Sequence, residues 1–83
     1  MARGHRQLEE GDAWQALLAF EEAARAEPRS VDPPYYMGVA YVRLGKYEAA
    51  QEQFQRALAL NPHHKPSAYG MALAKRAIVA VKD

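Results

Sequence analysis

Residues 31–64 read VDPPYYMGVAYVRLGKYEAAQEQFQRALALNPHH, and this stretch decides the fold because the chain repeats it on both sides. Shifting the 83-residue sequence by 34 positions aligns small, aromatic and proline residues in one ungapped register. The upstream pairs are Gly4 and Gly38, Gly11 and Gly45, Ala16 and Ala50, Phe20 and Phe54, Ala23 and Ala57, and Pro28 and Pro62. Downstream, the same shift aligns Tyr35 with Tyr69, Met37 with Met71, and Ala40 with Ala74. A fixed period of this length indicates a repeat architecture.

Each copy has the pattern of paired helices. Between residues 47 and 60 the apolar positions recur at steps of three and four, which is typical of a packed helix. Gly11 and Gly45 each follow an apolar segment, where we expect left-handed C-caps, with Asp12 and Asp32 capping the helices that come next. We therefore predict helices over 2–10, 13–26, 33–44, 47–60 and 66–81. The short connections predict antiparallel neighbours.

Composition narrows the function classes. The formal charge is +1, from 11 Lys and Arg against 10 Asp and Glu, so the chain has no overall basic surface for nucleic acid. There is no cysteine, and hence no disulfide framework or thiolate metal site. The polar N-terminus does not resemble a signal peptide, and the longest apolar run, residues 77–81, is too short to cross a bilayer. We expect a cytoplasmic protein with no membrane partner.

Catalytic and metal-binding patterns are weak. The adjacent pairs Glu9-Glu10 and Glu21-Glu22 point in different directions on a helix and do not converge on one substrate. His63 and His64 lack a spaced third ligand, so we interpret them as solvated loop residues. No glycine-rich phosphate loop is present. The sequence predicts a protein that is not an enzyme, with no catalytic residue, metal or cofactor. A helix-turn-helix DNA reader is disfavoured because helices 13–26 and 47–60 are acidic or neutral outside their apolar stripes.

Residues 31–64 resemble one complete tetratricopeptide repeat, because eight typed positions agree: Gly38, Tyr41, Gly45, Tyr47, Ala50, Phe54, Ala57 and Pro62. The usual Trp near the start is replaced by Pro34, and the Leu before the glycine by Met37. The resemblance implies an all-α, right-handed stack of antiparallel helix pairs. It also implies a single domain over 1–83, with a truncated repeat 1–30, a complete repeat 31–64, and a terminal helix or half-repeat 65–83.

The resemblance further implies a scaffold that captures a peptide or partner segment in a concave groove lined by the first helix of each pair. The family's groove positions fall on Tyr35, Val39, Val42, Arg43, Tyr69, Leu73, Arg76, His5 and Leu8. We expect an apolar segment whose acidic groups reach Arg43 and Arg76. The alternative is that the aliphatic residues simply pack helix 33–44 against the last helix. The family's carboxylate clamp for chaperone tails is not expected, because the matching positions lack asparagine.

Two apolar groups suggest a second function, a self-associating structural module or a fragment of a longer repeat array. Trp14 and Leu18 occupy the places that the next copy fills with Glu48 and Glu52. The last helix has no clear polar outer face near its end. The candidate self-association residues are Trp14, Leu18, Ile78, Val79 and Val81. The alternative for Trp14 is packing against the truncated first helix.

Overall fold

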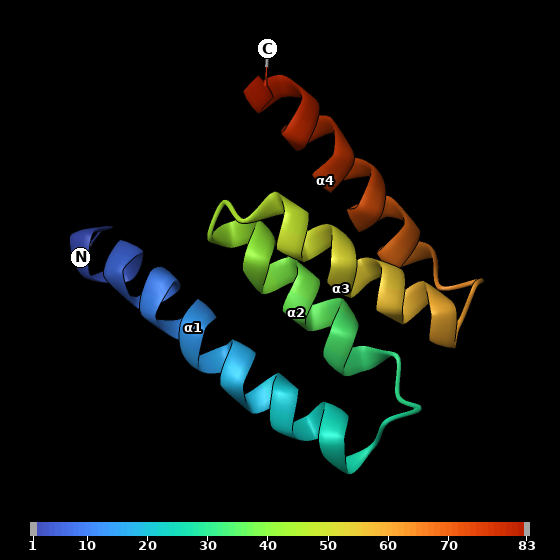
Figure 1. Cartoon of the computed structure of the whole chain (residues 1–83). Coiled ribbons are helices and arrows are strands. Elements are labelled where there is room, and N and C mark those ends of the chain that lie inside the picture. Colours follow the sequence, from blue (N-terminus) through green and yellow to red (C-terminus); the bar gives the residue numbers. More distant parts are fainter. Residues whose placement is uncertain (1, 83) are drawn as a thin grey trace.

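The computed structural model describes the backbone of residues 2–82 and the side chains of residues 11–80. Over that backbone the chain forms four α-helices and no strand: α1 (Ala2–Ala26), α2 (Asp32–Arg43), α3 (Tyr47–Leu60) and α4 (Lys65–Lys82). The helices follow one another as an antiparallel stack (Figure 1). In this stack α3 lies between α2 and α4, α2 also contacts α4, and α1 contacts α2. The predicted all-α helical-repeat stack is confirmed.

Phe54 occupies the centre of the α2–α3–α4 packing. Its side chain is only 1% exposed, in a cluster with Ala50 and Ala74. A Cβ atom on Gly38 of α2 would stand 2.6 Å from the Phe54 ring, and one on Gly70 of α4 would stand 2.5 Å from it. Real carbon contacts are close to 3.5–4.0 Å. The two glycines therefore allow two helix backbones to approach the same aromatic ring closely.

A second cluster joins α1 to α2. Its buried members are Ala13, Leu17, Met37 and Ala40, with Phe20, Tyr41 and Leu44 packed at its edge. Because α2 also contributes Tyr35, Val39 and Val42 to the Phe54 cluster, it is covered from two sides. This burial is the reason that α2 can be apolar almost all round.

Gly45 ends α2 in the way that its sequence position predicts. Its φ of 75° is left-handed, a region that glycine enters without steric cost. The Gly45 N–H donates to the Val42 carbonyl (3.0 Å), and the Lys46 N–H donates to the Tyr41 carbonyl (2.9 Å). These two bonds form a Schellman motif, which turns the chain directly into α3.

The predicted break at the matching glycine, Gly11, is wrong. Helix α1 runs without interruption from residue 2 to residue 26, so Gly11 is helical and Asp12 caps nothing. Sequence supplies the physical reason. Val39, Tyr41 and Val42 hold α2 against the Phe54 cluster, whereas the corresponding positions 5, 7 and 8 are His, Gln and Leu. With little apolar area to gain from a turn, the segment keeps the cooperative hydrogen bonding of one long helix.

Two smaller predictions at helix starts also need correction. Asp32 is the first helical residue of α2 and not its cap, because Val31 occupies the N-cap position and makes no side-chain cap bond. His64 is a loop residue directly before α4, as predicted, but it is not fully solvated. It is partly buried at the start of α4, its Nδ1 shares a 2.7 Å hydrogen bond with Ser67 Oγ, and its ring meets the edge of Tyr35. This bond satisfies the fully buried Ser67 hydroxyl.

Candidate partner-binding surface

The predicted groove positions on α2 are divided between packing and surface. Tyr35, Val39 and Val42 are partly buried against the cluster of Ala50, Phe54 and Ala74. Because Ala74 belongs to α4, these three side chains help to pack α2 against both later helices. For Val39 and Val42, this is the packing that the alternative describes. Arg43, at the end of α2, is exposed.

The matching positions on α4 are much more open. Tyr69 is 68% exposed, Leu73 is 40% exposed, and Arg76 is also exposed. Their spacing of four and three residues places them along one side of the helix. Tyr69 occupies the repeat position of Tyr35, which α3 covers. Within the described part of the chain, no helix follows α4 to cover Tyr69 in the same way.

A row of aromatic rings connects the helices at the end of the stack where α2 begins. The Phe20 ring stacks on Tyr36, with centroids 5.3 Å apart and planes 17° apart. Tyr36 meets Tyr35 at 5.0 Å edge to face, and Tyr35 meets His64 at 5.2 Å. Offset and edge-to-face pairs at these separations are favourable. The row thus links α1, α2 and the start of α4 through side chains that remain partly open to solvent.

Tyr36 is a surface residue that the sequence analysis did not single out. The 34-residue shift nevertheless distinguishes it, because its counterpart is a residue of very different size. A shift of 34 residues places Tyr36 at the position of Gly70. Gly70 lets α4 approach the Phe54 ring, whereas the Tyr36 side chain meets the Phe20 ring by stacking. Phe20 consequently stays partly exposed, while Phe54 is buried.

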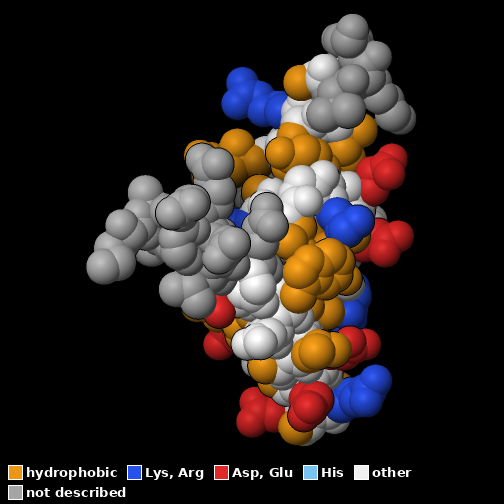
Figure 2. Space-filling model, turned by 90° about the vertical axis from the view of Figure 1, so that its left-hand side faces the viewer, with side chains coloured by type: hydrophobic (Ala, Val, Ile, Leu, Met, Phe, Trp, Pro, Cys, Tyr) orange, Lys and Arg blue, Asp and Glu red, His pale blue; other side chains and the backbone are white. Residues whose placement is uncertain are grey.

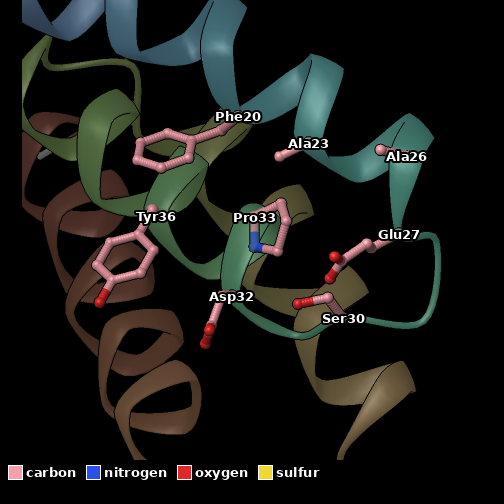
Figure 3. Close-up of a pocket in the computed structure, with 8 residues that line it drawn as sticks. All are labelled: Phe20, Ala23, Ala26, Glu27, Ser30, Asp32, Pro33 and Tyr36. Atoms are coloured by element: carbon pink, nitrogen blue, oxygen red, sulfur yellow. The ribbon is translucent and has the colours of Figure 1, made fainter.

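An open pocket lies beside this stacked pair, between the last turns of α1 and the start of α2. Figure 3 shows Phe20, Ala23 and Ala26 along α1, with Pro33 and Tyr36 on α2 facing them across the pocket. Glu27, Ser30 and Asp32 lie at its polar end, on the α1–α2 connection and the first residue of α2. The wall of this pocket is therefore apolar, with an acidic margin.

The candidate self-association residues are mostly on the surface. Trp14 is 50% exposed and Leu18 is 67% exposed, and Lys46 Nζ lies 5.9 Å from the centroid of the Trp14 ring. Val79 is 60% exposed and Ile78 is partly buried. His5, Leu8 and Val81 lie outside the residues whose side chains are described. The alternative that Trp14 packs on a separate first helix is wrong, because α1 is continuous.

Figure 2 shows the side of the molecule on which α1 lies. Hydrophobic side chains form separate patches there, with acidic and basic groups beside them. Among side chains 11–80, the ion pair is Glu21 with Arg25 at 3.9 Å, exposed and within one helix. A pair of this kind contributes little to stability. Over the same residues no group of three or more His, Asp or Glu side chains is arranged to hold a metal. The described helices also include none with the length and hydropathy of a membrane span.

Comparison with known proteins gives one family. A family model described as "Tetratricopeptide repeat" matches residues 7–76, which is most of the chain. No curated protein matches the sequence, and no solved structure matches it. The matched range includes all of α2 and α3, together with most of α1 and of α4.

Proposed function

Because this chain belongs to the tetratricopeptide repeat family, we propose that it captures a protein or peptide segment on the side of the stack where α2 and α4 adjoin. Tetratricopeptide repeats generally mediate protein–protein interaction, and they are typically non-catalytic scaffolds. The proposal gives this chain the same kind of role, with no catalytic step.

The observation that carries the proposal is the open apolar side of α4. Tyr69 and Leu73 are both large and exposed, one turn apart on the same side of the helix. Soluble proteins seldom leave such neighbours uncovered without a use for them, and Tyr and Arg are the residues most often dominant in binding energy. Arg76 lies one turn beyond Leu73 and is exposed. On α2, Tyr35, Val39 and Val42 form the partly buried floor and Arg43 an exposed basic edge.

The chemistry of this surface indicates the class of partner. Tyr69 and Leu73 together suit an apolar anchor such as Leu, Ile or Phe. Arg43 and Arg76 provide guanidinium groups that pair well with carboxylates. We infer that the partner segment is an amphipathic or extended apolar peptide with Asp or Glu beside its apolar residues. His5 and Leu8, at the matching positions of the first repeat, are proposed to extend the surface.

The test is selection from a library of random peptides displayed on phage, followed by binding titrations of the selected peptides. We expect selected sequences rich in Leu, Ile or Phe beside Asp or Glu. The double variant Tyr69→Ala/Leu73→Ala should weaken their binding by a factor of about ten or more, since interface residues of this kind often contribute over 1 kcal/mol each. Leu18→Ala, which removes an equally exposed apolar side chain from α1, is the matched control. Equal loss in the control, or no loss in the double variant, would reject this surface.

A second candidate function is self-association. It is favoured by the exposure of Trp14, Leu18 and Val79. None of these three residues occupies a repeat position assigned to the capture surface. This candidate predicts a concentration-dependent mass for the protein alone. The capture proposal predicts that binding of the selected peptides depends on Tyr69 and Leu73 at every protein concentration.

A further inference from the structure

One side of α4 is the repeat equivalent of a side of α2 that is covered. In α2 this side packs against the Phe54 cluster, and it consists of Tyr35, Gly38, Val39 and Val42. The residues 34 positions later in α4 are all exposed, and they are Tyr69, Ala72, Leu73 and Arg76. Among the described helices, none lies beside α4 as α3 lies beside α2. Helix α4 therefore resembles the first helix of a repeat whose second helix is supplied from elsewhere.

Helix α1 presents the other half of the same kind of contact. In α3, three side chains are at most 1% exposed: Ala50, Phe54 and Ala57. Their counterparts Ala16, Phe20 and Ala23 are partly exposed, and Ala19 beside them is exposed. These four residues, the α1 strip, lie along one side of the helix because they are three, four and seven positions apart. Among the described helices, α1 contacts α2 alone, so the strip lacks the partner helix that α3 has.

We propose that α4 of one copy packs on the α1 strip of a second copy, and so completes a repeat between two molecules. The two helices lie at opposite edges of the stack and do not contact each other within one chain (Figure 1). This inference rests on the proposed function, because it names the partner of the capture surface. The amphipathic segment with acidic residues beside apolar ones is residues 12–27 of another copy.

The register between copies follows from the helix pair inside the chain, in which Gly38 of α2 faces Phe54 of antiparallel α3. Moving α2 forward and α3 back by one repeat gives the contacts between copies: Ala72 with Phe20, Leu73 with Ala19, and Tyr69 with Ala23 and the Phe20 ring. Ala72 has a methyl group where Gly38 has none. The two helices therefore stay further apart than α2 and α3, and we expect an association that reverses on dilution.

Charge complementarity supports a second copy of this chain as the occupant. Residues 65–80 contain Lys65, Lys75 and Arg76 and no acidic residue. Residues 12–27 contain Arg25 and the acidic residues Asp12, Glu21, Glu22 and Glu27. In the proposed register Lys65 comes level with Glu27, and Arg76 lies about one turn from Asp12, all of them exposed. Complementary charges of this kind speed association and favour one register.

The contact joins two different surfaces, so each copy has one of each to offer. A heterologous contact of this kind continues from copy to copy, as an open chain or a closed ring. The assembly extends the stack in the same order of helices that each chain already has. We therefore expect the mean mass to rise beyond that of a dimer.

The first test measures mass by analytical ultracentrifugation from low to high micromolar concentration. Leu73→Glu on α4 and Ala19→Glu on the α1 strip should each raise the dissociation constant about tenfold or more, because each places a charge in an apolar contact. Leu18→Glu, also exposed on α1 but outside the strip, is the matched control and should change nothing. Circular dichroism checks that each variant stays folded. A natural chain that is monomeric throughout, or an assembly that only Leu18→Glu disrupts, overturns the inference.

The second test mixes the two disrupted variants. The Ala19→Glu copy keeps an intact α4, and the Leu73→Glu copy keeps an intact α1 strip. One contact can form between them, and neither free end can extend it. We expect a dimer with one copy of each variant from the mixture, although each variant alone is monomeric. Failure of the mixture to form this dimer contradicts the inference, because a symmetrical interface would not be restored by mixing.

Peptide titration separates this inference from the proposed function. The Ala19→Glu variant keeps Tyr69 and Leu73 open, so it should bind the peptides selected on phage, and the same peptides should dissociate the assemblies of the natural chain. If the peptides bind through Tyr69 and Leu73 while the natural chain stays monomeric, the inference fails and the proposed function stands. If the monomeric Ala19→Glu variant binds none of them, the proposed function itself fails.

Discussion

At the scale of single residues, the packing depends on where glycine permits close approach. Gly38 and Gly70 lie on different helices, yet both face the buried Phe54 ring. Gly45 has a different role, since it adopts a left-handed conformation and makes no close contact. Gly11 has neither role, because it is helical and open space surrounds it. Identical residues at matched repeat positions therefore have opposite sensitivities to substitution.

Gly38→Ala should destabilise the protein by about 1–3 kcal/mol, because the new methyl group enters the space of a ring that has no room to move. The measurement is urea denaturation followed by circular dichroism. Intrinsic helix propensity acts in the opposite direction, since Ala is favoured over Gly by about 1 kcal/mol in a helix. A stability equal to or above that of the natural chain would show that Phe54 yields and that the close approach is unimportant.

The pair Gly11→Ala and Gly45→Ala tests the continuity of α1. Gly11→Ala should stabilise by about 0.5–1 kcal/mol, as expected inside a helix with free space around the position. Gly45→Ala should destabilise by about 1 kcal/mol, because its φ of 75° is strained for a residue with a Cβ. Thermal unfolding of the two variants gives the comparison. If both lower the melting temperature alike, Gly11 is a turn residue and α1 is divided.

At the scale of elements, the two phenylalanines show how one substitution alters helix packing. Tyr36 stands where the next repeat has Gly70, so α2 meets Phe20 through a stacked ring and not through its backbone. The α1–α2 contact is then open at that end, and the pocket of Figure 3 is the result. The α3–α4 contact has no such spacer and encloses Phe54 completely.

Phe54→Ala should therefore cost about 3–5 kcal/mol, the usual penalty for emptying a closed aromatic site. Phe20→Ala should cost less than half as much, because its ring is partly exposed and mainly loses the stacking with Tyr36. Equilibrium denaturation of both variants under one set of conditions checks the ratio. Equal losses would show that Phe20 is as well buried in solution as Phe54, and would contradict this difference in packing.

At the scale of the whole molecule, the packing contacts are concentrated on the helices in the middle of the stack. Helix α3 is covered by α2 and α4, whereas α1 rests on α2 and α4 ends the described series. Repeat proteins gain stability mainly from neighbour contacts, so the interior helix has the largest share. Helices α1 and α4 carry Leu18, Tyr69 and Val79, the most exposed large apolar residues among side chains 11–80.

Native-state hydrogen exchange should show this gradient. We expect the amides of α3 to exchange more slowly than those of α1 and α4, because local opening is easiest where few contacts are lost. Uniform protection across all four helices would contradict the gradient.

The sequence by itself determined the repeat, the antiparallel helices 47–60 and 33–44 to within a residue or two, and the turn at Gly45. These features depend on local spacing and on backbone preferences that a 34-residue shift makes visible. It also placed Tyr69, Leu73 and Arg76 on one helix side, although their use in binding stays a prediction. Only the tertiary structure decided that Gly11 is helical, that Tyr35 and Val39 are partly buried, and that Phe20 is left partly open beside Tyr36. Each of these depends on whether a neighbouring helix is present to supply apolar contacts, and the same residue type at the same repeat position has that neighbour in one copy and lacks it in the other.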